Sequence, residues 1–341
     1  MDKYLRDLAE KLFNTHSPTG YSNDVNKLLV TELTSLGYEP TISNKGNVFI
    51  KVKGNSSEIT RATSAHVDTL GLMVRSINSN GTLKVTNIGG PIIPTLDGEY
   101  CVIKTRDNKE YTGTILCTSN ATHVYSDASS KVRNVDNMEV RLDVEVKNKQ
   151  DVLNLGINNG DYVCYDPKFT IVNDFIKSRF IDDKGGVLCL FSILKEISIS
   201  ICNPLAYDTY FYFVNHEEVG HGATTISDEI DEFVTIDMGC VGLDLAGNEY
   251  SVSICAKDSS GPYDYNLTTK LINISKDNQI DYVVDIFPYY GSDVSAALRS
   301  GKDIKGALIG PGVAASHGME RTHVKAIENT IKLMNTYLSS K

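Results

Sequence analysis

Side chains able to bind metal stand at the ends of several apolar segments in this 341-residue chain. The segment ATSAHVD contains His66 and Asp68, FVNHEE contains Glu217 and Glu218, and VTIDMG contains Asp237. Imidazole nitrogens and carboxylate oxygens are the usual protein ligands of zinc-class ions. The residue types at these positions therefore indicate a metal site.

Two further segments complete the set. FIDDKGG places Asp182 and Asp183 just before a helical pattern, and the segment after GALIGPG holds His317 and His323. In open α/β sheets, ligands gather beyond the carboxyl ends of the strands, so residues far apart in sequence can converge there. Each segment alone is explained better by a strand end, a helix N-cap or a solvated acidic loop than by a metal site. Only the combination favours a metal site.

Chemistry with two metal ions gives each residue a predicted role. A pair of ions about 3.5–4 Å apart needs a bridging carboxylate, for which we expect Asp182. Asp68, two residues after His66, is expected to fix the imidazole tautomer. Glu217 is then left to take a proton from the metal-bound water and to deliver it to the leaving amine. The expected terminal ligands are His66, Glu218, Asp237 and His323.

The elements that must position these side chains follow from the spacing of apolar residues. Residues 23–36 show helical spacing, and Gly37 is a suitable C-cap. Further helices are predicted over residues 185–199 and 324–338. Strands are predicted over residues 47–52, 62–67, 210–214, 233–236 and 307–309.

Residues 72–165 have a different character. Short alternating segments are separated by turn dipeptides such as Asn80-Gly81 and Asp107-Asn108, which is typical of a small β-barrel. We therefore expect residues 1–71 and 166–341 to form one α/β domain, interrupted by a β-barrel domain of residues 72–165.

Composition excludes several classes of protein. The net charge is −10 and no basic stripe is present, which disfavours binding to nucleic acid. No apolar run reaches 18 residues, so no membrane association is expected.

The first residues, MDKYLRDLAEKLF, read as an amphipathic helix without signal-peptide features, which predicts a cytoplasmic location. The seven cysteines lack CxxC spacing and are expected to be reduced thiols.

Several of these motifs occur together in one known family. HVDTLGLMV, SRFIDDKGG, NHEEVGHGA, VTIDMG and ERTH, in this order, resemble the metallopeptidases of clan MH, family 42. That family includes glutamyl, lysyl and leucyl aminopeptidases that assemble as tetrahedral (TET-type) particles. The resemblance covers nearly the whole chain, including the β insert. It maps Asp182 onto the bridging ligand, Glu217 onto the catalytic base and Asp68 onto the histidine-orienting acid.

The resemblance carries further expectations. It implies an α/β, mixed-sheet, three-layer metallopeptidase domain of the phosphorylase/hydrolase-like type with an inserted small β-barrel used for oligomerisation. It implies two divalent ions per subunit, zinc or cobalt, with manganese as a third candidate. The implied partners are peptides with a free N-terminus and further copies of the chain, in a homo-oligomer built from dimers that extends to a dodecamer.

Three positions depart from the family pattern. Thr69 stands where the family more often has an acid, and His216 stands where it has glutamine. The final motif is ERTH instead of an aromatic-rich RYxH, which makes His317 a rival of His323 for the last ligand position. These departures leave the expected ligand set in place. They leave open which N-terminal side chain of a substrate is preferred.

Two further residues keep alternative interpretations. Asp293, in YYGSDVSAA, is either an acid close to the active site or part of a helix N-terminus after Ser292. His123, in the insert, is either an exposed loop residue or a residue that reaches a neighbouring active site.

The sequence as a whole favours a two-metal aminopeptidase that hydrolyses N-terminal residues from peptides. A related dinuclear amidohydrolase or deacylase, acting on small N-acyl substrates, is the nearest alternative. A metal-free scaffold, in which the β insert serves as an assembly module, is the alternative from another class.

Overall fold

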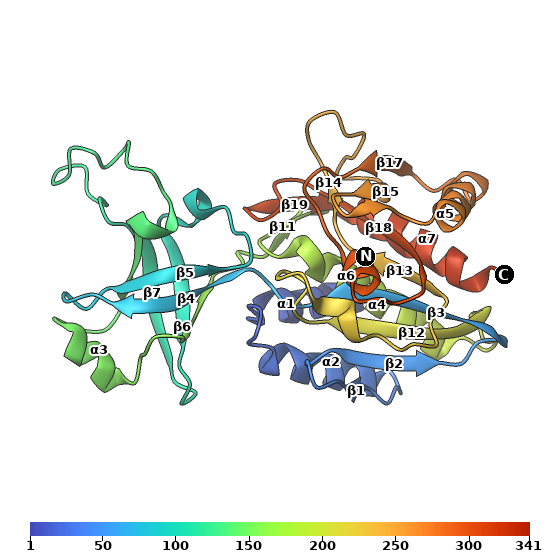
Figure 1. Ribbon diagram of the computed structural model, residues 1–341, viewed down its shortest axis with the longest axis horizontal. Coiled ribbons are helices and arrows are strands. Elements are labelled where there is room, and N and C mark those ends of the chain that lie inside the picture. Colours follow the sequence, from blue (N-terminus) through green and yellow to red (C-terminus); the bar gives the residue numbers. More distant parts are fainter. The chain divides into compact units, whose positions relative to one another are not determined.

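The computed structural model describes all residues, Met1–Lys341, and the chain divides into two compact units. One unit contains Met1–Asp68 and Lys168–Lys341, and the other contains Thr69–Pro167. The sequence-based boundaries at 71/72 and 165/166 fall beside these division points. The larger unit is therefore assembled from two separate stretches of the chain, seen at the blue end and the yellow-to-red end of the colour scale in Figure 1.

The larger unit is built on a 10-stranded mixed sheet (Figure 1). In spatial order, its main path contains β1 (Thr41–Ile42), β2 (Val48–Val52), β12 (Tyr207–Val214), β3 (Ser56–His66), β13 (Glu232–Ile236), β18 (Lys305–Val313), β15 (Val252–Asp258) and β16 (Gly261–Pro262). Two strands lie off this path: β17 (Tyr282–Ile286) pairs with β15, and β14 (Gly239–Cys240) pairs with β18.

Four neighbouring strands in the middle of this sheet, β12, β3, β13 and β18, run parallel to one another. The register places Val214, the last residue of β12, opposite His66, the last residue of β3. It also places Thr235 of β13 opposite Ser64 of β3. The carboxyl ends of these strands therefore share one edge of the sheet, and the residues that follow them lie along that edge.

Helices cover both faces of this sheet. Successive residues of a strand point to opposite faces, so Phe211 and Phe213 of β12 join one hydrophobic cluster while Tyr212 and Val214 join the other. The first cluster includes residues of α1 (Lys3–Asn14), α2 (Asn23–Ser35), α4 (Ile181–Ile199), α5 (Tyr265–Asp277) and α7 (Val324–Ser339). The second includes residues of α6 (Asp293–Arg299) and the 3₁₀ helix η3 (Gly222–Thr225). The predicted three-layer α/β class is confirmed.

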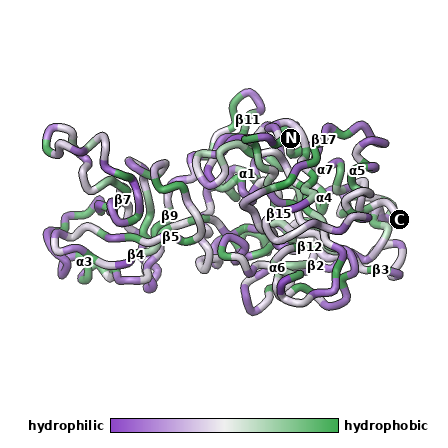
Figure 2. The backbone as a smooth tube through the Cα atoms, turned by 45° about the horizontal axis from the view of Figure 1, so that its top comes forward, coloured by the Kyte–Doolittle hydropathy of each residue, from purple (hydrophilic) through white to green (hydrophobic).

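The smaller unit is a closed antiparallel barrel. Its strands, in order around the barrel, are β4 (Gly71–Ile77), β5 (Leu83–Ile88), β8 (Met138–Leu142), β7 (Glu110–Cys117), β6 (Glu99–Lys104) and β9 (Tyr162–Tyr165). Alternate residues such as Val85, Ile103 and Ile115 are fully buried and fill its interior. Figure 2 shows hydrophobic stretches on these strands next to hydrophilic turns. The unit also contains η1 (Ile93–Leu96), η2 (Val135–Asn137) and α3 (Lys149–Leu155).

Most predicted elements are present, and several have longer bounds. The helix expected over 185–199 begins earlier, at Ile181, and the strand expected over 62–67 begins at Ser56. A small sheet of β10 (Thr170–Val172), β11 (Phe175–Ser178) and β19 (Glu320–His323) was not predicted, and neither were α5, β15 and β17. None of the helices is both long enough and apolar enough to cross a membrane.

Candidate active site

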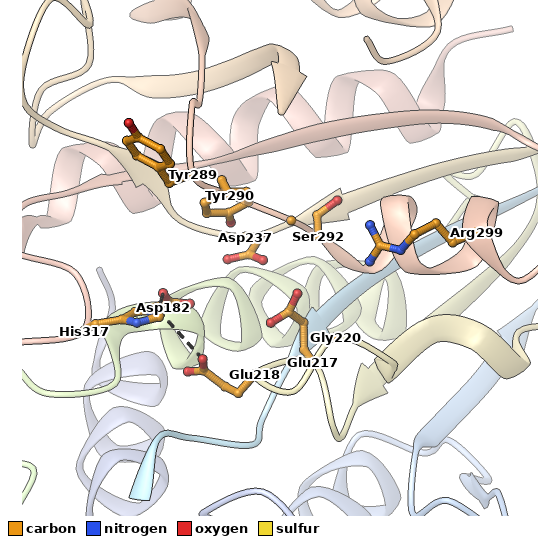
Figure 3. Close-up of a pocket in the computed structure, with 11 residues that line it drawn as sticks. Asp182, Glu217, Glu218, Gly220, Asp237, Tyr289, Tyr290, Ser292, Arg299 and His317 are labelled. Atoms are coloured by element: carbon orange, nitrogen blue, oxygen red, sulfur yellow. Dashed lines mark ion pairs between the residues drawn. The ribbon is translucent and has the colours of Figure 1, made fainter. Parts of the chain in front are cut away.

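All the expected metal ligands except His323 converge at the carboxyl edge of the parallel strands, where Figure 3 shows Asp182, Glu218 and Asp237. His66 ends β3, Glu217 and Glu218 follow β12, Asp237 follows β13, and Asp182 lies in the first turn of α4. Candidate ligand atoms within 4.8 Å of one another form two overlapping groups. These are His66 with Asp182 and Glu218, and His66 with Asp183 and Asp237.

The ring of His66 has a defined orientation. Its Nδ1 lies 3.0 Å from the backbone carbonyl oxygen of Asp68, an acceptor, which assigns the ring proton to Nδ1. Nε2 then carries the lone pair and lies 3.0 Å from Asp182 Oδ1 and 3.9 Å from Glu217 Oε2. In its neutral form, His66 would therefore direct a ligand nitrogen at the carboxylates.

Asp68 positions the loop after β12 as well as the imidazole. Its carboxylate accepts hydrogen bonds from the backbone N–H groups of Glu217 (3.1 Å) and Glu218 (3.3 Å) and from the Thr19 hydroxyl (2.6 Å). The nearest distance from this carboxylate to His66 Nδ1 is 3.7 Å, longer than the bond to the Asp68 carbonyl. The expected tautomer-fixing role thus falls to the backbone of Asp68, while its carboxylate fixes the paired glutamates.

His317, and not His323, lies beside the acidic cluster. His317 Nε2 is 3.5 Å from Asp182 Oδ2 and 3.7 Å from Glu218 Oε2. Asp182 consequently lies between two imidazoles, with Oδ1 near His66 and Oδ2 near His317. This is the placement required of a bridging carboxylate.

His323, which the sequence analysis assigned as the last ligand, has a structural role in this structure. It is the N-cap of α7, and its Nδ1 accepts a hydrogen bond from the backbone N–H of Lys325 at 3.1 Å. Its ring packs against Phe175 and Tyr250, with centroid separations of 4.9 Å in both cases. An imidazole engaged in this way is not directed at the cluster.

Glu320 is a residue of the site that sequence reasoning missed. Its side chain is buried, and it accepts hydrogen bonds from the backbone N–H groups of Asp182 (3.0 Å) and His317 (3.1 Å). It therefore connects the start of α4 with the loop after β18. Its motif, ERTH, drew attention to the histidine, whereas the glutamate is the residue that contacts the site.

Asp183 and Asp293 hold the backbone in the same manner. Asp183 accepts from the N–H groups of His66 (3.1 Å) and Gly186 (3.0 Å). Asp293 accepts from the N–H of Ala223 at 3.0 Å and from the Ser64 hydroxyl at 3.2 Å.

Asp293 fits both interpretations made from the sequence, the start of a helix and an acid close to the site. Ser292 is the N-cap of α6, and Asp293 is the first helical residue. The Asp293 carboxylate nevertheless reaches the segment after β12, where a Cβ added at Gly222 would lie 2.5 Å from Asp293 Oδ1. His123, the other open case, lies exposed in a turn of the barrel unit.

The electrostatics of the cluster favour cations or protons. Burial raises the pKa of both Glu217 and Glu218 well above the usual range. Burial and the charge of Asp182 raise the pKa of Asp237 to about 7. Burial opposes the charged form of His66, but the hydrogen bond that protonated His66 donates to Asp182 and the nearby carboxylates outweigh it and raise its pKa.

The donor set fits divalent cations. Glu218 Oε1 is buried without a hydrogen-bond partner, which is costly for a carboxylate oxygen unless a cation or proton reaches it. Imidazole nitrogen and carboxylate oxygen are ligands that zinc-class ions accept. The site therefore has both the ligand types and the unsatisfied negative charge that such ions need.

A small cavity of about 230 Å³ lies directly over the cluster (Figure 3). It is lined by Asp182, Glu217, Glu218, Gly220, Asp237, Tyr289, Tyr290, Gly291, Ser292, Arg299 and His317. A substrate group bound there would face the carboxylates from the side of α6.

An α/β sheet whose parallel strands deliver imidazole and carboxylates to a cavity has the architecture of a hydrolase of the metallopeptidase type. The family model described as M42 glutamyl aminopeptidase matches residues 46–333. The chain therefore belongs to this family, and it is a peptidase.

Similarity to individual proteins extends over the full length. The chain is 44% identical over 336 residues to the putative aminopeptidase YhfE of Bacillus subtilis, covering 98% of this chain and 97% of that protein. It is 24% identical to the lysyl aminopeptidase of Pyrococcus furiosus, with 97% and 96% covered. Among solved structures, a Pyrococcus horikoshii TET1 peptidase that "can assemble into a tetrahedron or a large octahedral shell" matches with a TM-score of 0.87 and 20% identity, covering 99% and 100%.

The raised pKa values predict how the stability of the metal-free protein depends on pH. Folded Asp237 and His66 bind protons that the unfolded chain releases, so the free energy of unfolding falls as pH rises from about 5 to about 8. Thermal melts across this range should show a falling Tm, and saturating zinc should flatten the curve. Asp237→Asn should weaken the dependence. A Tm that rises with pH in the metal-free protein would contradict a protonated cluster.

Proposed function

We propose that this chain is a two-metal aminopeptidase that removes N-terminal residues from peptides by means of a water molecule activated by Glu217. The observation that carries the proposal is the position of Asp182 between His66 and His317, with Glu218 and Asp237 beside it. Membership of the M42 family supports the reaction class.

His66, Asp182, Glu218, Asp237 and His317 would together hold the two ions, with Asp182 placed between the two imidazoles. This assignment replaces His323 by His317 and otherwise keeps the ligands expected from the sequence. Zinc and cobalt suit this mixture of nitrogen and oxygen donors, and manganese is a third candidate.

When bound, two divalent ions would supply Lewis acidity to the scissile carbonyl and lower the pKa of the attacking water. Glu217 lines the cavity, and burial raises the pKa of its carboxyl well above the usual range. A carboxylate of raised pKa is suited to accept the water proton and then to donate it to the leaving amine. Asp68 holds the backbone N–H of Glu217 and so fixes the position of this base.

The size of the cavity supports action at a chain end. A volume of about 230 Å³ is smaller than a typical pocket for a drug-sized ligand and suits a single residue. The related dinuclear deacylases remain the nearest alternative activity, because the metal chemistry would be the same. The relatives, one named a putative aminopeptidase and one a lysyl aminopeptidase, favour the peptidase.

We further propose that the chain forms a homo-oligomer through its barrel unit, residues 69–167. The solved TET1 peptidase with the same fold assembles into closed shells. Exposed apolar side chains on the barrel unit, including Tyr100, Val124 and Val132, supply surface that association could bury.

The Glu217 assignment predicts a separation of metal binding from catalysis. Glu217→Gln removes the proton acceptor but none of the proposed ligands, so kcat should fall by about 10²–10⁴-fold. Metal content, measured by elemental analysis, should equal that of the wild type. Wild-type turnover in this variant would rule out Glu217 as the base.

Substitution of His317 and substitution of His323 should have different effects. His317→Ala should reduce the bound metal from about two equivalents to about one. His323→Ala should keep both ions and lower the free energy of unfolding by about 0.5–2 kcal/mol, because a helix cap is lost. Metal titration and thermal melting of the two variants test this together, and loss of metal in the His323 variant alone would restore the original assignment.

Substrate panels separate the competing functions. Aminoacyl anilides with a free amine should be hydrolysed, and their N-acetyl counterparts should not. Chelator should abolish turnover, and zinc or cobalt should restore it. Turnover of blocked substrates only would identify a deacylase, and the absence of chelator-sensitive turnover on either panel would support a metal-free scaffold.

A further inference from the structure

The active-site cavity is covered at its floor and open at its rim. On the floor, the side chains of Asp182 and Glu218 are only 8% and 5% exposed. The ring of His317 is 36% exposed, and Tyr289, which also lines the cavity, is 94% exposed. Exposure therefore increases from Glu218 through His317 to Tyr289, which places Tyr289 at the mouth of the cavity.

Tyr289 is the only aromatic residue among the exposed residues that line the cavity. The others are Gly220, Gly291 and Arg299. The glycines offer no side chain, and Arg299 donates a hydrogen bond to the Ser260 hydroxyl at 2.6 Å. The protein provides neither a hydrogen bond nor a stacking partner for the Tyr289 ring. Figure 3 shows this ring pointing away from the carboxylates, whereas Tyr290 lies beside Asp237.

The position of Tyr289, and not its exposure alone, carries the argument. Single exposed apolar side chains are common on globular proteins and need no explanation. Tyr265, the first residue of α5, is 80% exposed and does not line the cavity. Tyr289 differs because its ring stands at the mouth of the cavity that holds the proposed catalytic groups. Val219 and Met319, two further exposed apolar residues, lie within two residues of lining residues.

A peptide whose first residue fills the cavity has to leave through this mouth. The volume of about 230 Å³ suits one residue, so the second residue of the peptide lies outside the cavity. Consecutive residues of an extended chain are only about 3.3 Å apart. The side chain of the second residue therefore lies at the rim, within reach of the Tyr289 ring.

We propose that Tyr289 binds the side chain of the second residue of the substrate, and that this peptidase selects peptides in which that residue is aromatic or a large aliphatic. The inference rests on the aminopeptidase function proposed above. A large apolar side chain at the rim would remove part of the exposed ring from water, and an aromatic one would add a ring contact. Alanine at this position would leave most of the ring exposed.

The first test varies the second residue at constant charge. The metal-loaded, full-length protein is assayed on dipeptide amides that share one first residue and carry Phe, Leu or Ala in second place. Release of the first amino acid gives kcat/KM for each substrate. Phe and Leu should exceed Ala by about 10-fold, because recognition rests on the burial of apolar surface. Equal kcat/KM values for the three would overturn the proposal.

Three variants assign the preference to the ring. Tyr289→Ala should lose the preference, and Tyr289→Phe should keep it, because the proposed contact uses the ring and not the hydroxyl. Tyr265→Ala is the matched control, because it removes the same side chain from an exposed position that does not line the cavity. A preference that persists in Tyr289→Ala, or that is lost equally in Tyr265→Ala, would overturn the role of Tyr289.

Binding and assembly give readouts other than turnover. In the Glu217→Gln background, where turnover is expected to be slow, calorimetry should give a lower Kd for the Phe peptide than for the Ala peptide. Adding Tyr289→Ala should remove this difference. Size-exclusion chromatography should give the same elution volume for the wild type and Tyr289→Ala. Dissociation of the variant would identify the ring as part of an interface between copies of the chain and would overturn the proposal.

The outcomes also separate this inference from the proposed function. Hydrolysis of free-amine peptides regardless of the second residue would remove the inference and leave the aminopeptidase in place. No hydrolysis of any of them would remove both. Equal metal content and equal Tm in wild type and variants, measured beforehand, ensure that differences in kcat/KM report on substrate recognition.

Discussion

The parallel pairing of β3 with β12 and β13 is the constraint on which the candidate site depends. Because Val214 lies opposite His66, the residues that follow both strands start from the same edge of the sheet. A slip of one residue would turn every side chain of a strand to the other face. Such a slip would exchange Phe211 and Phe213, which pack in one cluster, with Tyr212 and Val214, which pack in the other.

A second group of carboxylates fixes the backbone segments that carry the candidate metal ligands. Asp68, Asp183, Asp293 and Glu320 do not need to bind metal, since each accepts hydrogen bonds from backbone N–H groups near the cluster. Those bonds connect β3, the loop after β12, the start of α4 and the loop after β18. Segments that carry like charges are thereby held together before any cation arrives.

Sequence reasoning succeeded where a side chain follows directly from a strand or begins a helix. His66, Glu217, Glu218, Asp237 and Asp182 all occupy such positions, so the predicted edge of the sheet was sufficient to bring them together. It did not identify which of His317 and His323 lies beside Asp182, because only the path of the chain distinguishes them. The unpredicted strand β19 turns His323 toward Phe175 and leaves His317 beside Asp182.

The sequence by itself determined the α/β class, the inserted barrel and the residue types of the imidazole and carboxylate cluster, because strand periodicity and ligand chemistry are local properties of the chain. Only the tertiary structure decided which histidine faces Asp182, that the carbonyl of Asp68 orients His66, and that Arg299 borders the cavity. These depend on the pairing and packing of segments distant in sequence. No spacing along the chain reports on them, since the burial that enforces them exists only once the sheet is assembled.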